Sequence, residues 1–205
     1  MTVQRRASSG RSVVVVPYDP AWPHAFAAVA DDIASAMGPN LLALHHIGST
    51  SVPGMAAKPV VDMLAVVADL ADVDRQARAV ERLGYEAMGE FGIEQRRYFR
   101  RDDAAGRRTH QLHAFEDGSP HVRRHLAFRD FLRAHPAVAQ QYGDLKQRLA
   151  EAHPHDADAY IDGKDGFVKE TEQRALRWRP ASDGGPAATD DLAAAAPHAA
   201  EPPSG

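Results

Sequence analysis

The sequence predicts an α+β domain built on a mixed β-sheet with helices packed on it. Two observations support this class. Short apolar and β-branched runs typical of strands occur between residues 13 and 116, whereas residues 119–178 show helical apolar spacing and helix starts. Because strands come first and helices last, we expect an α+β domain with its helices on one face of the sheet.

The first half of the chain alternates strands and helices. Residues 13–16 form a short apolar run, and Asp19-Pro20 then starts a helix that Gly38-Pro39 ends. Residues 41–47 and 60–67 are apolar runs that we expect at the centre of the sheet. Between Leu70 and Gly84, apolar residues recur at helical spacing and predict a second helix.

The second half begins with three strand patterns and continues with helices. The expected antiparallel strands span residues 85–91, 95–101 and 107–116, the last two joined by the turn DDAAG. Proline and helical spacing then predict helices over residues 120–134, 136–152 and 156–178.

Composition favours a single domain. The 205 residues are 44% hydrophobic and 25% charged, which suits one folded unit over residues 12–179. The polar segment 1–11 and the Ala-, Pro- and Gly-rich segment 180–205 are expected to be disordered. No apolar run approaches the roughly 18 residues of a membrane span, so we expect a cytoplasmic protein with no membrane partner. The absence of cysteine excludes thiol chemistry.

The most informative stretch runs from His46 to Val67. Gly48 and Ser49 follow an apolar strand, and glycine there permits a sharp turn and close approach of a phosphate to the backbone. Lys58 then precedes a strand whose apolar residues surround Asp62. A carboxylate in an apolar strand is costly to bury without a partner, so Asp62 is the strongest candidate for chemistry.

Five motifs along the chain resemble the GrpB family. They are VVPYDPAW at 15–22, HIGSTSVPG at 46–54, AAKPVVDM at 56–63, THQLHAF at 109–115 and HLAFRDFLRAHP at 125–136. The resemblance spans roughly residues 12–179. It implies a nucleotidyltransferase-like fold in which a Gly-Ser turn holds phosphate and acids project from adjacent strands. It also implies a relationship to the domain fused to some dephospho-CoA kinases.

The chain departs from the nucleotidyltransferase pattern at its acids. That pattern places two carboxylates at alternate positions of one strand, but Leu64 stands where the second would follow Asp62. The neighbouring strand supplies His110 and His113 instead of a third carboxylate. Two metal sites remain as alternatives: Mg²⁺ on Asp62 completed by ligand phosphates, which we rank first, or a transition metal on Asp62 and a histidine such as His113.

From this resemblance and these residue types we assign candidate roles. Asp62, Lys58 and His113 are the candidate catalytic residues, and Asp62 and His113 the candidate metal ligands. The candidate ligand-binding residues lie in the turn, the lysine loop, the Arg-aromatic segment and the histidines beside them: His46, Gly48, Ser49, Thr50, Ser51, Lys58, Glu94, Arg96, Arg97, Tyr98 and His110. Each group also has a structural alternative. Residues 48–51 could form a plain tight turn, and Lys58 could form a salt bridge with Asp62. The histidines could be structural, and the Arg-aromatic segment could be a sheet face with one buried ring.

Two functions therefore remain open. One is a nucleotidyltransferase-like protein that binds a nucleotide or another phosphorylated small molecule and transfers a nucleotidyl group with a divalent metal on Asp62. The other is a catalytically inactive accessory module linked to coenzyme A metabolism or to a protein partner. Nucleic-acid binding ranks last because the net charge is −4, although ten arginines lie between residues 96 and 133.

Overall fold

The structure, a computed structural model, describes residues 12–178 and the backbone of 191–193. Apart from 191–193, the chain ends expected to be disordered lie outside the described residues. The helices are α1 Ala21–Met37, α2 Leu70–Arg82, α3 Pro120–Ala134, α4 Pro136–Ala152 and α5 Ala157–Arg177, with 3₁₀ turns η1 Gly38–Asn40 and η2 Ser49–Ser51. The strands are β1 Leu41–Ile47, β2 Val61–Val67, β3 Glu86–Ala87, β4 Arg97–Asp102, β5 Arg108–Glu116 and β6 Asp191–Ala193.

The strands of the described residues form one mixed sheet in the order β3-β4-β5-β2-β1-β6. The central pair β2 and β5 is parallel, and the other neighbouring strands pair antiparallel. The predicted α+β class and mixed sheet are therefore confirmed. Strand β2 lies at the expected centre, but β1 does not, because β5 and not β1 forms the central pair with β2. Strand β6, which the sequence did not predict, pairs with the outer edge of β1.

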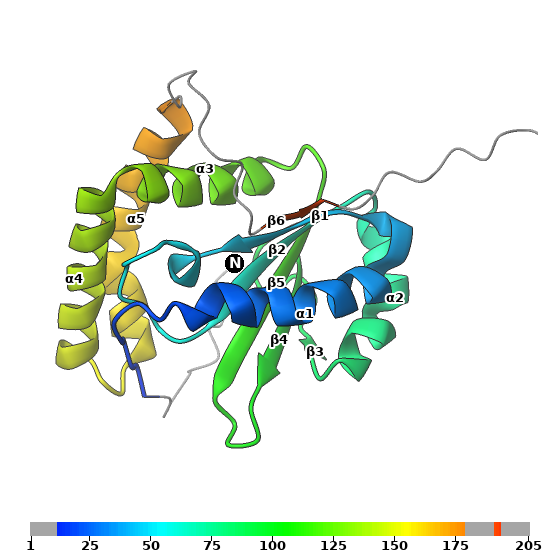
Figure 1. The fold of residues 1–205 in the computed structure, drawn as a ribbon, viewed down its shortest axis with the longest axis horizontal. Helices are drawn as coiled ribbons and strands as arrows, with labels where there is room; N and C mark the ends of the chain where they lie inside the picture. The colour runs from blue at the N-terminus through cyan, green and yellow to red at the C-terminus, as the bar shows by residue number, and fades with distance from the viewer. Residues whose placement is uncertain (1–11, 179–190, 194–205) are drawn as a thin grey trace, which may run out of the picture.

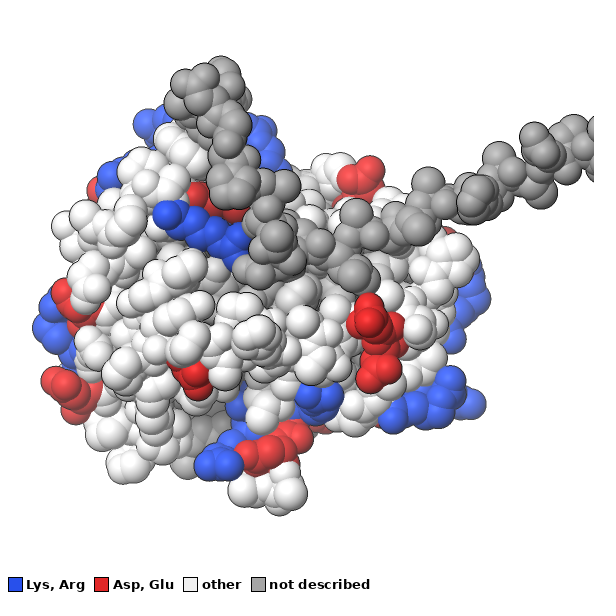
Figure 2. Space-filling model, in the orientation of Figure 1, with Lys and Arg blue, Asp and Glu red and all other residues white. Residues whose placement is uncertain are grey.

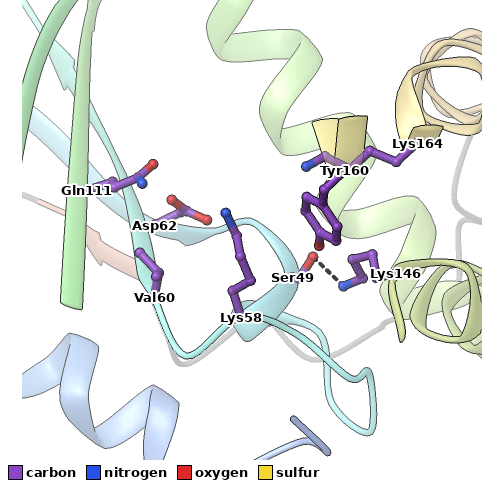
Figure 3. A pocket seen from close by; sticks show the side chains of 8 residues that line it. All are labelled: Ser49, Lys58, Val60, Asp62, Gln111, Lys146, Tyr160 and Lys164. Carbon is purple, nitrogen blue, oxygen red and sulfur yellow. Dashed lines mark hydrogen bonds between the residues drawn. The ribbon is translucent and has the colours of Figure 1, made fainter. Parts of the chain in front are cut away.

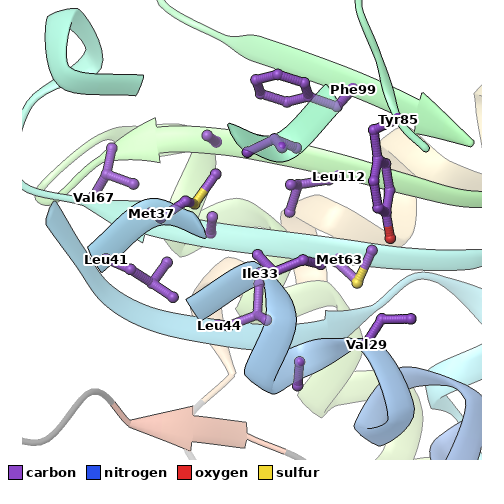
Figure 4. Close-up of a cluster of buried hydrophobic side chains, with 14 of the residues drawn as sticks. Val29, Ile33, Met37, Leu41, Leu44, Met63, Val67, Tyr85, Phe99 and Leu112 are labelled. Atoms are coloured by element: carbon purple, nitrogen blue, oxygen red, sulfur yellow. The ribbon is translucent and has the colours of Figure 1, made fainter. Parts of the chain in front are cut away.

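Helices cover both faces of the sheet, so the expectation that they lie on one face is wrong (Figure 1). Strand β2 shows the reason, because its residues are apolar at successive positions. Val61 and Met63 pack with α1 and α2 in the main core (Figure 4), whereas Leu64 and Val66 pack with Phe115 and α3 on the opposite face. A strand that is apolar on both sides needs cover on both sides.

Local signals set the helix boundaries. The Asp19 side chain accepts a hydrogen bond from the backbone N–H of Ala21 at 2.8 Å, and Asp69 does the same for Ala71 at the start of α2. Gly38 ends α1 with a φ of 53°, a conformation that a side chain disfavours. Capping residues therefore mark the starts of α1 and α2 and the end of α1.

Two strand predictions were too long. The run 13–16 contributes one isolated bridge, between Val16 and Ala57. The expected strand 85–91 shrinks to two residues because the following loop turns repeatedly. Phe91 and Gln95, like the glycines around them, take positive φ values that no β-strand can continue.

Helices α3, α4 and α5 pack against one another beside the loop that joins β1 to β2 (Figure 1). Val52 and Met55 of that loop are buried among residues of these helices, including Leu132 and Tyr142. The loop is therefore enclosed between the sheet and a helical layer.

The face of the molecule shown in Figure 2 carries its charged side chains mainly at the margins, where basic and acidic residues lie close to one another. No broad region of one sign is visible on that face. Within the part of the chain that the structure describes, no helix has the length and apolar character needed to cross a membrane.

Candidate functional site

A pocket opens where the β1–β2 loop meets the sheet and helices α4 and α5 (Figure 3). Its cavity volume is about 140 Å³, below the roughly 300–1,000 Å³ that ligand pockets commonly enclose. The lining residues come from the loop and sheet (Ser49, Lys58, Val60, Asp62 and Gln111) and from the two helices (Lys146, Tyr160 and Lys164).

The Gly-Ser turn and Asp62 are in direct contact. In the β1–β2 ladder, Ile47 pairs with Asp62, so Gly48 follows immediately beside the carboxylate. A Cβ on Gly48 would overlap Asp62 Oδ2 and lie 2.9 Å from Asp62 Cβ. Gly48 also adopts φ 70° and ψ −170°, a combination essentially restricted to glycine. The turn thus requires glycine for its backbone and for the position of the acid.

The Asp62 side chain is partly buried at the pocket wall, and this burial raises the pKa of its carboxyl to about 6. Lys58, Lys164 and Lys146 oppose this rise through their positive charges. Among the described residues, no group donates a hydrogen bond or forms a close ion pair with this carboxylate. The predicted alternative of a direct Lys58–Asp62 salt bridge is therefore absent, although the two charges still interact.

Three lysines share the pocket. Burial lowers the pKa of Lys58, lowers that of Lys146 to about 7 and lowers that of Lys164 to about 8. Repulsion among the lysines lowers the pKa values of Lys146 and Lys164 further, while Asp62 raises them. Lys146 Nζ donates a hydrogen bond to Ser49 Oγ at 2.7 Å. The site is therefore rich in positive charge that the protein itself only partly balances.

Tyr160 separates two of these lysines. Lys58 Nζ lies 5.5 Å and Lys164 Nζ 5.3 Å from the centre of its ring, within the range of cation–π attraction. Figure 3 shows the Lys58 side chain extending between Asp62 and the helical side of the pocket. The ring therefore helps to hold two like charges in one small space.

Helix α3 anchors the turn from behind. Arg129 Nη1 donates to the carbonyl of His46 at 3.2 Å, and Arg133 Nε donates to the carbonyl of Ser51 at 2.9 Å. The Ser51 hydroxyl donates to the carbonyl of Gly48 at 2.7 Å. These bonds occupy three carbonyls of the turn and fix its shape before any ligand arrives.

The structure does not bring His46, Thr50 or His110 into the pocket. The His46 ring is fully buried, stacked on Phe26 of α1, and its Nε2 lies 3.0 Å from Thr50 Oγ1. His110 lies 2.9 Å from a guanidinium nitrogen of Arg101. His46 and His110 face the α1 side of the sheet, and Asp62 faces the other side, because side chains alternate along each strand.

His113 shares the sheet face of Asp62 but packs in a separate cluster. Its register partner is Leu64, two positions along β2 from Asp62. The ring lies against those of Tyr98 and His125, and Arg96 Nη1 is 3.4 Å from its Nδ1. Burial, reinforced by the nearby arginines, lowers the His113 pKa to about 3. These surroundings are those of a neutral core histidine.

The Arg-aromatic segment also lies outside the pocket lining. Arg96 donates to the carbonyls of Glu90 and Phe91 and so holds its own loop. Arg97 makes a two-point ion pair with Asp74 of α2. The Tyr98 hydroxyl accepts a hydrogen bond from Arg108 at 3.1 Å, and Glu94 is exposed in the loop.

Most arginines of this region have carboxylate partners. Six of the ten arginines between residues 96 and 133 form ion pairs with carboxylates of the described residues: Arg97 with Asp74, Arg100 with Glu86, Arg107 with Asp103, Arg108 with Asp102, Arg124 with Glu172 and Arg129 with Asp130. This matches the expectation of self-paired charge rather than an open basic surface.

Of the predicted site residues, the structure places Gly48, Ser49, Lys58 and Asp62 together, with Ser51 bracing the turn. Sequence reasoning did not assign Lys146, Tyr160, Lys164 or Gln111 to the site. Lys146 is 97 residues from its partner Ser49. Gln111 could have been found, because it lies beside Asp62 in the parallel β2–β5 register, where a third acid was sought.

The pocket does not fit a divalent metal held by the protein alone. Among the described residues, no group of three or more His, Asp or Glu side chains is arranged to bind a metal. The single carboxylate of Asp62 also faces three lysine charges, which repel a cation. Gln111 contributes only a neutral amide beside it.

A family model described as "GrpB protein" matches residues 12–174 of this chain. The UPF0157 protein YqkA of Bacillus subtilis is 43% identical over 169 residues, which cover 82% of this chain and 49% of the relative. A dephospho-CoA kinase of Mycolicibacterium paratuberculosis is 28% identical over 190 residues, covering 81% of this chain and 46% of that protein. The chain thus spans about half the length of these curated relatives.

Solved structures show similarity as well. The crystal structure of conserved protein GrpB from Enterococcus faecalis has a TM-score of 0.76 and 45% identity, covering 80% of this chain and 97% of that one. Terminal uridylyl transferase 4 from Trypanosoma brucei with bound dUTP has a TM-score of 0.48 and 15% identity, covering 76% of this chain and 53% of that one.

Proposed function

Because the chain belongs to the GrpB protein family, we propose a function from the geometry of its own pocket: it binds a phosphorylated small molecule, of which nucleotides are one class. One observation carries the proposal. Three lysine ammonium groups, from the β1–β2 loop, α4 and α5, converge on a pocket that holds a single carboxylate.

The electrostatics support an anionic ligand. Bringing three ammonium groups together in one pocket is unfavourable, and burial together with the neighbouring lysines lowers the pKa values of Lys146 and Lys164. A phosphate oxyanion among them would replace repulsion with attraction and accept several charge-assisted hydrogen bonds. The Ser49 hydroxyl adds a neutral partner on the same wall. Phosphate therefore suits this pocket better than a neutral or cationic ligand.

Nucleotidyl transfer with a metal on Asp62 remains a prediction. The donor set at Asp62 does not favour a protein-held metal, so we derive no step through one. In the proposed function the lysines neutralise the phosphate charge without a cation.

The proposal is tested by calorimetric titration of pyrophosphate and of adenosine mono-, di- and triphosphates. We expect Lys164→Gln to weaken binding by about tenfold or more, the usual consequence of removing a charge-assisted hydrogen bond. Lys169→Gln is the matched control, since Lys169 lies on the same helix but is exposed and paired with Asp165. Equal affinity in the two variants, or no binding by the wild type, would contradict the proposal.

A second experiment tests whether binding depends on a metal, by measuring pyrophosphate affinity with and without EDTA. The proposed function predicts that EDTA leaves this affinity unchanged. Binding that requires added Mg²⁺ or Mn²⁺ and disappears in Asp62→Ala would instead support the metal-dependent transferase.

A catalytically inactive accessory module is the second candidate. Leu64 and Gln111 occupy positions where the transferase pattern calls for acids, and this observation favours it. A relative named dephospho-CoA kinase matches this chain over 46% of the relative's own length. This match suggests a dephospho-CoA kinase as the partner to test. The measurement is the activity of a dephospho-CoA kinase with and without this protein; an unchanged rate would oppose the accessory role.

A further inference from the structure

Asp62 and Gln111 form a polar pair on the sheet side of the lysine pocket. They are register partners on the parallel strands β2 and β5, and both side chains line the cavity. Figure 3 shows the two side chains close together, with the lysines of α4 and α5 on the far side. The pocket therefore has two chemically different walls.

The polar pair lacks partners within the described protein. No hydrogen bond or close ion pair satisfies the Asp62 carboxylate, and none is made by the Gln111 amide. Asp62 and Gln111 are both only partly buried and line the open pocket, so water or a bound ligand completes their hydrogen bonds. A ligand with suitable donors replaces that water when it binds.

The chemistry of the pair specifies those donors. An ionised carboxylate only accepts hydrogen bonds, whereas an amide both donates and accepts. A hydroxyl group also donates and accepts, so adjacent hydroxyls can bond to the carboxylate and the amide together. A phosphate oxygen cannot, because it would bring a second negative charge against Asp62.

We propose that Asp62 and Gln111 form a hydroxyl-binding subsite, so that the pocket selects phosphate esters of polyhydroxyl compounds such as sugar phosphates and nucleotides. This inference rests on the proposed function, since the lysine wall must hold the phosphate. The subsite uses the carboxylate directly as a hydrogen-bond acceptor, which leaves no role for a metal on it.

The experiment is calorimetric titration with three probes that share a phosphate ester but differ in hydroxyls: ribose 5-phosphate, 2-deoxyribose 5-phosphate and methyl phosphate. We expect the wild type to bind ribose 5-phosphate about tenfold or more tighter than methyl phosphate, as expected for hydrogen bonds to a charged acceptor. The deoxy compound should lie between them.

Two variants test the two members of the pair. Gln111→Leu should reduce the ribose-to-methyl affinity ratio. Asp62→Asn should reduce the same ratio but bind methyl phosphate more tightly, because the substitution removes a negative charge that faces the lysine wall. A variant whose pocket had collapsed would not bind methyl phosphate more tightly than the wild type does. Gln140→Leu, at an exposed position of α4, is the control for a Gln-to-Leu change.

The outcomes separate the two proposals. If methyl phosphate binds but the ribose-to-methyl ratio is near one, or is unchanged in both variants, the hydroxyl subsite is overturned while the lysine wall stands. If the wild type binds none of the three probes, both proposals are overturned. Loss of methyl phosphate binding in Asp62→Asn would overturn the subsite in favour of a metal on Asp62.

Discussion

At the residue scale, the site depends on one contact between a turn and a strand. The Asp62 carboxylate occupies the space where a Cβ on Gly48 would lie. The backbone of Gly48 has a positive φ as well, so two independent constraints act at this position. Together they set where the acid faces in the pocket.

Gly48→Ala should therefore be more damaging than backbone strain alone predicts. We expect a loss of about 2–4 kcal/mol in the free energy of unfolding, from strain of roughly 1–3 kcal/mol plus displacement of Asp62. Urea denaturation measures this loss. Gly54→Ala is the matched control, because Gly54 also has positive φ (77°), but a Cβ added to it would meet no atom within 4 Å. Equal losses in the two variants would show that the contact with Asp62 contributes nothing.

At the element scale, helices α4 and α5 deliver Lys146 and Lys164 to the pocket, and their separation depends on small residues. A Cβ on Gly163 would overlap Leu149 of α4 and lie 3.1 Å from its Cδ1. Gly163 directly precedes Lys164 in the chain. The contact between α4 and α5 at Gly163 therefore lies next to a pocket lysine in the chain.

Two glycine substitutions on α5 should have different effects on the stability of the protein. Gly166→Ala meets no neighbouring atom within 4 Å and should stabilise the protein by about 0.5–1 kcal/mol through helix propensity. Gly163→Ala gains the same propensity, but its Cβ must displace the methyl groups of Leu149, which offsets part of that gain. Thermal unfolding should place Gly163→Ala below Gly166→Ala. The reverse order would mean that the helix contact is loose.

At the scale of the whole molecule, stability should fall in mild acid because of buried histidines. Burial lowers the pKa of His113 to about 3, of His125 to about 2 and of His110 to about 4, from 6.5 in the unfolded chain. Below pH 6.5 these histidines therefore bind protons in the unfolded state but stay neutral in the folded state, so the free energy of unfolding decreases. Asp62 has the opposite effect between pH 6 and 4. Its pKa is raised in the folded state, so its protonation there increases the free energy of unfolding.

The free energy of unfolding should thus decrease from pH 7 to pH 4.5 in urea titrations. Each histidine contributes a slope of up to about 1.4 kcal/mol per pH unit. His125→Gln should make the slope shallower by up to that amount, whereas His155→Gln, at an exposed position, should leave it unchanged. An identical slope in the His125 variant would show that this residue is protonated in the folded protein.

Local sequence was sufficient for the elements whose signals are local. Asp19-Pro20 and Ser119-Pro120 placed the starts of α1 and α3 within a residue or two, and apolar spacing from Leu70 placed the start of α2. The apolar run of β2, interrupted by Asp62, revealed a buried strand with a candidate functional acid. The strand expected at 85–91 was too long because the backbone reversals near Phe91 leave little trace in the residue types.

The turn, Lys58 and Asp62 were predictable because they lie within fifteen residues of one another on consecutive elements. The sheet faces on which His46 and His113 lie were not predictable from the sequence. They depend on the strand register and on which helices cover each face. Tertiary structure alone decided that Lys146 and Lys164 join the site, because helices that follow the sheet by many residues fold back over the turn. A sequence records the charge of such residues but not the distance between them, which is set by packing.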